Sequence, residues 1–396
     1  MRTQTHNYVL GVAALAFLLV LTLAASLPAR AQSESVLYNF CSLTFCHDGL
    51  NPYGTPVMGS QGNFYGTTFF GGATGSGTVF KVSPDGTETV LYSFLPGTTD
   101  GNSPAAGLVI DKQGNLYGTT FSGGTYGFGG TVFKLSPNGT ETILHNFGGA
   151  SDGVRPQAAL IRDGRGNLYG TTVVGGAYGN GTVFEITASG TESVLHSFAQ
   201  NTSDGGFPQA GLIMDSRGNL YGTTVYGGAS AYGTVFRIGP EGTETVLHNF
   251  GNKSDGQNPY GSLVMDNKGI LYGTTYGGGA LRAGTVFKLS PNGAEWVLHS
   301  FDPKLGDGEL PIAGLLLGAN GNLYGTTAFG GSSGAGTVFE ISTDGTETIL
   351  HNFSGSTADG ATPYSNLSMD SNGNLYGTTY NGGTTFASGT LYKITP

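Results

Sequence analysis

Apolar residues along this chain recur in short clusters that alternate with polar positions, and turn-forming residues separate one cluster from the next. One stretch contains four such clusters, at residues 104–111, 115–121, 131–136 and 141–147. Each cluster is rich in β-branched and aromatic types and is bounded by Gly, Pro, Asn or Asp, which is typical of β-strands. No segment after residue 31 shows a helical period, so the pattern predicts an all-β protein.

This pattern of four clusters repeats along the chain. Its most regular part reads Gly-Asn-Leu-Tyr-Gly-Thr-Thr, and seven versions of it begin at Gly62, Gly114, Gly166, Gly218, Gly269, Gly321 and Gly373. Successive copies begin 51 or 52 residues apart, which indicates a repeat architecture. Repeating units of four antiparallel strands are typical of propeller blades. We therefore predict a seven-bladed β-propeller that forms a single domain from residue 32 to 396.

The two ends of the repeat array predict how the ring closes. The last copy stops after its third strand, at residues 391–394, and a fourth strand without a partner precedes the first copy, at residues 34–40. Pairing these segments would complete the seventh blade and remove exposed strand edges. A solenoid would instead need polar capping repeats, and none is visible in the sequence.

Residues 1–31 have the features of a secretory signal peptide. Residues 9–25 are almost wholly apolar, Arg2 precedes them, and Ala29-Arg30-Ala31 matches a small-x-small cleavage site. An uncleaved N-terminal anchor is the alternative. No later run approaches the roughly 18 apolar residues that a membrane span needs. We expect a secreted or periplasmic protein with no membrane contact after cleavage.

Charge and cysteine content narrow the partners. The formal net charge of -10 argues against nucleic acid as a partner. Cys41 and Cys46 are the only cysteines and lie close together in an exported chain, so we expect a local disulfide, with two free thiols as the alternative. His47 is adjacent, but no second ligand pair follows at the spacing of a metal site.

Two repeated features point to the axis of the propeller. Every copy carries Asp-Gly-x-x-Pro, beginning at Asp48, Asp100, Asp152, Asp204, Asp255, Asp307 and Asp359. We interpret this motif as a turn into the first strand, with a ring of calcium ligands as the alternative. Two residues after each proline the side chain is small, as expected where seven inner strands converge.

The residue just before each small side chain varies between copies, as Tyr53, Ala105, Gln157, Gln209, Tyr260, Ile312 and Tyr364. If the small residues line the axis, these neighbours surround the mouth of the central channel. Tyr53, Gln157, Gln209, Tyr260 and Tyr364 are the expected ligand contacts.

Long loops should gather on one face of the propeller. The loops at residues 122–130 and 148–156 are long, whereas the other turns are tight, and long loops usually carry function. Tyr126 and Phe128 in the first loop could stack on a sugar ring or receive a peptide. The alternative is that they only pack the loops together.

Histidines and carboxylates do not predict an active site. Five copies have His at one position of the fourth cluster, where the other two have Tyr38 and Tyr92, which indicates a half-buried ring with a polar tip. Asp302 and Glu309 are acids outside the repeat pattern and form a candidate acid-base pair, with a solvated loop as the alternative. No Gly-x-Ser-x-Gly or His-Glu-x-x-His motif is present. We expect no catalytic residues, no cofactor and no metal.

The repeated unit resembles a known family. Gly-Asn-Leu-Tyr-Gly-Thr-Thr-x-x-Gly-Gly, followed by Gly-Thr-Val-Phe-Lys-Leu and Gly-Thr-Glu-Thr-Val-Leu-His-x-Phe, resembles the Gloeo/Verruco tandem repeat of exported bacterial proteins from residue 34 onward. Phe64, Ile270, Gly59 and Gly318 depart from the pattern. The resemblance implies export and a propeller-like shape but no assigned activity, so no site residues carry over. The Gly-Gly pair is also similar to kelch blades, in architecture only.

Two functions fit these expectations. The first is an exported, monomeric binding or scaffold protein whose loop face takes a polysaccharide or a protein. The second is an extracytoplasmic hydrolase or lyase that acts at the channel mouth.

Overall fold

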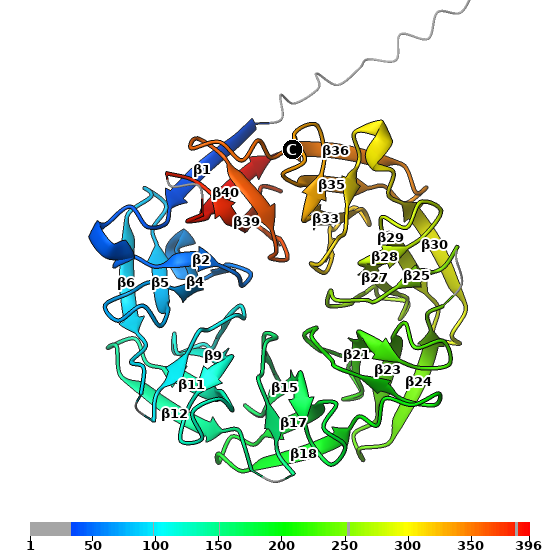
Figure 1. Cartoon of the computed structure of the whole chain (residues 1–396), viewed down its shortest axis with the longest axis horizontal. Helices are drawn as coiled ribbons and strands as arrows, with labels where there is room; N and C mark the ends of the chain where they lie inside the picture. The colour runs from blue at the N-terminus through cyan, green and yellow to red at the C-terminus, as the bar shows by residue number, and fades with distance from the viewer. Residues whose placement is uncertain (1–32, 98, 150, 252–253, 385–386) are drawn as a thin grey trace, which may run out of the picture. The chain divides into compact units, whose positions relative to one another are not determined.

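The computed structural model describes residues 33–97, 99–149, 151–251, 254–384 and 387–396. The predicted signal peptide at 1–31 lies outside the described residues. Within them, seven antiparallel sheets of four or five strands follow one another around a ring, which confirms the predicted seven-bladed β-propeller (Figure 1). The helical elements of the described part are three short 3-10 turns: η1 (Thr44–Cys46), η2 (Ser60–Gly62) and η3 (Pro303–Leu305). No described helix is long and apolar enough to cross a bilayer.

Each blade contains four strands from the axis to the rim, in chain order in six blades, whereas β1 is the outermost strand of the seventh. The innermost, or first, strands are β3 (Val57–Met58), β8 (Val109–Ile110), β14 (Ile161–Arg162), β20 (Ile213–Met214), β26 (Val264–Met265), β32 (Leu316–Leu317) and β38 (Ser368–Met369). The second strands are β4 (Phe64–Phe70), β9 (Leu116–Thr120), β15 (Leu168–Thr172), β21 (Leu220–Thr224), β27 (Leu271–Thr275), β33 (Leu323–Thr327) and β39 (Leu375–Gly382).

The third and fourth strands of each blade are five to seven residues long, and a register shift interrupts the pairing between them. The third strands are β5 (Thr78–Val82), β11 (Thr131–Leu135), β17 (Thr182–Ile186), β23 (Thr234–Ile238), β29 (Thr285–Leu289), β35 (Thr337–Ile341) and β40 (Thr390–Thr395). The fourth, outermost strands are β1 (Ser33–Asn39), β6 (Glu88–Ser93), β12 (Glu141–Asn146), β18 (Glu192–Ser197), β24 (Glu244–Asn249), β30 (Glu295–Ser300) and β36 (Glu347–Asn352).

Short strand pairs connect the loops above each blade. The segment that enters a blade forms β2 (Leu50–Pro52), β7 (Gly101–Asn102), β13 (Gly153–Val154), β19 (Gly205–Gly206), β25 (Gly256–Gln257), β31 (Gly308–Glu309) or β37 (Gly360–Pro363). It pairs with the end of the second strand in that blade, either within β4 and β39 or as β10 (Ser122–Gly123), β16 (Val174–Gly175), β22 (Tyr226–Gly227), β28 (Gly277–Gly278) and β34 (Phe329–Gly330). The long loops therefore share one face of the ring.

The ring closes through its two ends, as predicted. β1 runs antiparallel to β40, and Val36 pairs with Tyr392 (Figure 1). Phe40, which follows β1, is fully buried. The first and last parts of the folded chain therefore build one blade together.

The first strand is shorter than predicted. The sequence suggested a strand at 104–111, but only Val109–Ile110 pairs with β9. The backbone before it bonds to the neighbouring blade instead: the Thr67 hydroxyl donates to the Ala106 carbonyl at 2.8 Å. Equivalent bonds follow around the ring and end with the Thr378 hydroxyl and the Gly54 carbonyl. Inner segments therefore hold adjacent blades together and leave little room for side chains.

Hydrophobic cores lie between consecutive blades. One cluster joins Val132 and Phe147 of the second blade to Leu160, Leu168 and Phe184 of the third. The phenyl rings of Phe147 and Phe184 meet at 5.0 Å between centroids, and equivalent contacts recur at the other junctions. Each blade thus buries its apolar face only against its neighbours.

Candidate functional site

A narrow pocket lies on the propeller axis and is formed by the inner segments. Its lining includes the small residues and their variable neighbours, among them Gly54, Ala106, Ala158, Ala210 and Gly261. A larger residue would not fit at Gly54, because a Cβ there would collide with the Ala106 backbone. The pocket encloses about 90 Å³, which is room for several water molecules. We call it the axial pocket.

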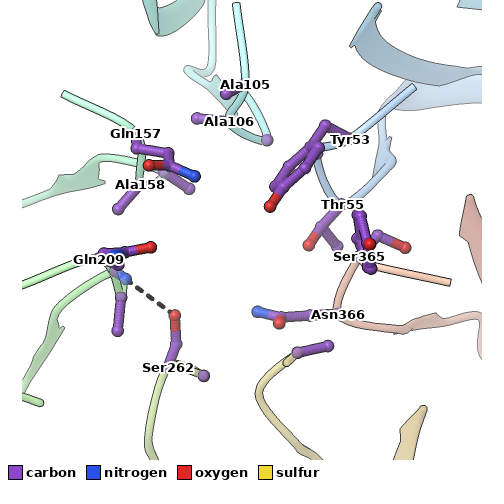
Figure 2. A pocket seen from close by; sticks show the side chains of 18 of the residues that line it. Tyr53, Thr55, Ala105, Ala106, Gln157, Ala158, Gln209, Ser262, Ser365 and Asn366 are labelled. Carbon is purple, nitrogen blue, oxygen red and sulfur yellow. Dashed lines mark hydrogen bonds between the residues drawn. The ribbon is translucent and has the colours of Figure 1, made fainter. Parts of the chain in front are cut away.

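Half-buried polar side chains surround this pocket. Tyr53, Gln157, Gln209, Tyr260 and Tyr364 all belong to its lining. Figure 2 shows the Tyr53 hydroxyl and the amide ends of Gln157 and Gln209 around the same opening. These five predicted contacts come from blades that are far apart in the sequence, and the ring brings them together.

Tyrosine rings form a group of three and a separate pair at the mouth. The ring centroid of Tyr53 lies 5.3 Å from that of Tyr364 and 6.0 Å from that of Tyr380. Tyr364 and Tyr380 are 5.4 Å apart, and Tyr260 is also 5.4 Å from Tyr276. The mouth therefore carries five clustered tyrosines in the described part of the chain.

Tyr276 and Tyr380 were missed by the sequence analysis. Both follow directly after Gly-Thr-Thr, at a position where other copies have Phe69, Phe121, Val173, Val225 and Ala328. The signal was an aromatic residue at this position in more than half of the copies. The equivalent residue Phe121 ends the predicted strand at 115–121, and the sequence gives no sign that a side chain at this position faces the axis.

Burial raises the pKa of the tyrosine hydroxyls further above neutral pH. Desolvation, and after it the neighbouring Tyr364, raise the pKa of Tyr53 to about 12, while a hydrogen bond with Gln157 lowers it. Desolvation followed by the neighbouring Tyr380 also raises the pKa of Tyr364. These hydroxyls are therefore neutral hydrogen-bond donors at physiological pH.

Two predicted contacts lie elsewhere. Tyr126 and Phe128 are 51% and 73% exposed on the long loop of the second blade, and neither belongs to the axial pocket. The Tyr126 side chain packs against Gly148, which follows the outermost strand β12. This contact holds the loop away from the axis. They are part of the loop face but not of the axial site.

The candidate acid-base pair is also outside the pocket. Asp302 accepts a hydrogen bond from the Lys304 backbone N–H at 3.0 Å and thereby caps η3. Glu309 lies in β31, opposite Phe329. Asp302 therefore has a capping role in its loop, and Glu309 is part of a short strand pair.

A second group of polar residues lies at each junction between blades, near the rim. His145 of β12 bonds through Nε2 to Asp152 at 3.0 Å, and Glu192 of the next blade approaches both. Tyr38 and Tyr92 replace His at two junctions and donate to Asp48 and Asp100 in the same way. The equivalence of His and Tyr confirms the predicted half-buried ring with a polar tip.

The Asp of each Asp-Gly-x-x-Pro motif connects the long loop before a blade to the polar group at the junction. Asp152 also accepts hydrogen bonds from the backbone N–H groups of Gly148 and Gly153. Among the described residues, five junctions bring ligand atoms of one His, one Asp and one Glu within 4.8 Å of one another, a set of groups that could hold a divalent cation. The Nε2 atom is already used by the Asp in each of them.

The glutamates of these junctions all have a raised pKa. Burial, and after it the negative charge of the Asp in the preceding loop, raise the pKa of Glu88, Glu141 and Glu295 to about 7. One oxygen of each junction glutamate is buried without a hydrogen-bond partner among the described residues. A protonated glutamate can donate to the facing Asp and so remove the repulsion between two carboxylates.

The two cysteines lie in the loop between β1 and β2. Cys41 and Cys46 are joined by a disulfide, and Phe45 between them is 85% exposed. Neither cysteine belongs to the axial pocket.

Comparisons with known proteins agree on the architecture. The chain resembles a solved structure described as the extracellular domain of a hybrid two-component system of B. thetaiotaomicron, with a TM-score of 0.59, 14% identity and coverage of 91% of this chain and 39% of that one. It also resembles PorZ, a surface component of the type-IX secretion system of Porphyromonas gingivalis, with a TM-score of 0.54, 16% identity and coverage of 87% and 46%.

A third similar structure is described as a 6-phosphogluconolactonase of Bacteroides uniformis, with a TM-score of 0.52, 16% identity and coverage of 80% of this chain and 88% of that one. The chain spans less than half the length of the first two proteins. At these identities the likeness shows the fold alone. No curated protein matches the sequence significantly.

The family is shown by the sequence itself. A model described as the Gloeobacter/Verrucomicrobia repeat matches residues 25–214, 129–317 and 212–396. These matches overlap and cover nearly the whole chain. The chain therefore belongs to the Gloeobacter/Verrucomicrobia repeat family.

Proposed function

We propose that this chain is an exported binding protein that presents its long-loop face to a polysaccharide or a protein, with the axial pocket at the centre of the contact. The proposal rests on the residues that surround the mouth of the axial pocket. The residues that form strands and turns repeat from blade to blade. The residues around the mouth differ between blades and include half-buried tyrosines and glutamines. Aromatic rings with a few converging polar groups are typical of ligand sites.

The surroundings of the mouth support this proposal. Phe70, Tyr178, Tyr232 and Phe329 are exposed on the loops of the same face, which gives it an apolar character. Exposed apolar groups mark an interaction surface where they form a contiguous patch. Two similar folds belong to proteins described as extracellular or surface components, which supports export.

The test is a binding screen with residues 32–396. We expect binding on a glycan array or capture of a protein from the cell envelope, and loss of that binding when Tyr53, Tyr260 and Tyr364 are changed together to Ala. Trp296→Ala is the matched control, because this exposed aromatic lies on β30 at the rim. Equal binding by the triple variant would contradict the proposal.

A further inference from the structure

We propose that the axial pocket takes an uncharged, polyhydroxylated ligand, namely a unit of a neutral glycan that stacks on the tyrosines of the mouth and bonds to Gln157 and Gln209. This inference rests on the proposed function and names the ligand class of its site.

The first argument for a neutral ligand is the lack of charged side chains in the described lining of the axial pocket. Among the described residues of the axial pocket there is no Asp, Glu, Lys, Arg or His. Arg155 is two residues before Gln157 in the sequence, but its guanidinium lies over the Phe121 ring at 5.4 Å from the centroid and is not part of the lining. The chain as a whole has a formal net charge of -10, so an anionic polymer would be repelled. Nothing in the lining could offset that repulsion.

The tyrosine group carries the second step. The rings of Tyr53 and Tyr364 are inclined by 55° to each other, and those of Tyr53 and Tyr380 by 85°. The mouth therefore presents both faces and edges of rings, with hydroxyl groups beside them. Amphipathic aromatic side chains of this kind suit a sugar, which has an apolar face of C–H groups and a polar edge of hydroxyls.

The amides carry the third step. Gln157 and Gln209 each offer an acceptor oxygen and two donor hydrogens, which matches hydroxyl groups that donate and accept. Ser262 and Asn366 in the lining are already bonded to the backbone N–H groups of Gly211 and Gly314. Figure 2 shows Gln157 and Gln209 directed to the opening beside them. Gln157 shares one hydrogen bond with Tyr53, and the remaining donors and acceptors of the two glutamines can bond to a ligand.

The size of the pocket sets the binding mode. A space of about 90 Å³ does not admit a polymer. One terminal or branching unit can reach the mouth, and the rest of the glycan would then lie across the loop face.

The experiment is native affinity electrophoresis of residues 32–396 in gels that contain one polysaccharide each. The neutral probes are a soluble β-glucan, a galactomannan and a xylan, and the anionic probes are alginate and polygalacturonate. We expect retardation by at least one neutral probe and by neither anionic probe. Tyr53→Ala with Tyr364→Ala and Tyr380→Ala should weaken it at least tenfold, whereas Trp296→Ala should not change it.

Two further variants keep the test decisive. Gln157→Leu with Gln209→Leu leaves the tyrosines in place and should also weaken retardation, in case the tyrosine variant does not fold. Tyr126→Ala with Phe128→Ala alters the loop tips, and a loss in this variant alone would overturn the axial site. Retardation by an anionic probe alone, or by no probe, overturns the inference, while the proposed function still stands if the axial tyrosines are needed to bind a protein.

Discussion

The glycine of Asp-Gly-x-x-Pro is required by a close approach and not by a turn. Gly256 lies in β25 with an ordinary backbone conformation, and a Cβ there would collide with the Thr275 side chain. The Thr275 hydroxyl bonds to that of Thr285 at 2.8 Å, so Thr275 cannot turn away without breaking a buried bond. Six of the seven copies share this arrangement, and only Gly49 has a positive φ among these glycines.

Gly256→Ala should therefore destabilise the fold by about 1–3 kcal/mol, the usual cost of overpacking. Urea unfolding would measure the change. Gly277→Ala is the control, because a Cβ at this nearby glycine meets nothing closer than 4.0 Å. Equal effects of the two substitutions would show that the Thr275 contact is not the cause.

The residue before each motif proline is held in the left-handed region in all seven copies. These residues, none of them glycine, are Asn51, Ser103, Arg155, Phe207, Asn258, Leu310 and Thr362, with φ between 54° and 61°. Their backbones join adjacent blades: the Leu310 N–H donates to the Ala283 carbonyl of the preceding blade, and the Leu310 carbonyl accepts from Ala328. The local strain is maintained by contacts between blades.

Leu310→Asn should stabilise the protein by roughly 0.5–1 kcal/mol. Asn tolerates the left-handed region better than Leu. At the equivalent position Asn258 also donates to the Val225 carbonyl at 2.9 Å, a bond that the new side chain could copy. Thermal unfolding would measure the gain, with Leu310→Ala as the control that keeps the strain. A stability no higher than that of the Ala variant would contradict this explanation.

At the scale of elements, each outermost strand begins with a glutamate that faces the Asp of the preceding loop. In the unfolded chain these glutamates release a proton near their ordinary pKa of 4.5, whereas in the fold Glu88, Glu141, Glu244 and Glu295 do so at about 7. Between these values the folded state binds more protons than the unfolded state. Stability therefore decreases as the pH rises through this window.

We expect the apparent Tm to be several degrees lower at pH 8 than at pH 5. Glu244→Gln with Glu295→Gln should raise the Tm at pH 8 and change it little at pH 5, because an amide stays neutral and can donate to Asp204 and Asp255. Differential scanning calorimetry measures both values. The exposed Glu241→Gln is the control, and a shift of equal size at the two pH values would refute the mechanism.

At the scale of the whole molecule, stability depends on closing the ring. No blade has a core of its own, because the apolar clusters lie between blades. β1 pairs with β40 over six residue pairs, and Phe40 fills the junction between the seventh and the first blade. Losing this strand exposes one edge of the propeller and opens a cavity.

A chain that begins at Cys41 should therefore lack a cooperative unfolding transition and should self-associate in size-exclusion chromatography. A synthetic peptide of residues 33–40 should restore the monomer and the transition when added in excess. The same peptide with Phe40→Ala should restore much less, because a buried Phe contributes about 3–5 kcal/mol. A stable, monomeric truncated protein would show that closure by β1 is dispensable.

Much of the architecture could be predicted because each blade is encoded locally. Strand clusters, turn residues and their period follow from positions close together in the chain, so the number of blades, their strand order and the closing strand pair were predicted correctly. The first strand was predicted too long, because bonds such as that from Thr67 to Ala106 belong to the neighbouring blade. Sequence spacing carries no information about such partners.

The sequence by itself determined the repeat, the ring and the positions that would surround the axis. Only the tertiary structure decided which of those residues meet. Tyr53 and Tyr380 stand at opposite ends of the chain and contact each other only after the ring has closed. The glutamates of the outer strands likewise acquire their raised pKa only in the fold, from burial and then from the aspartate of the loop that enters their own blade. Local patterns fix elements, whereas contacts between distant elements depend on the geometry that closure imposes.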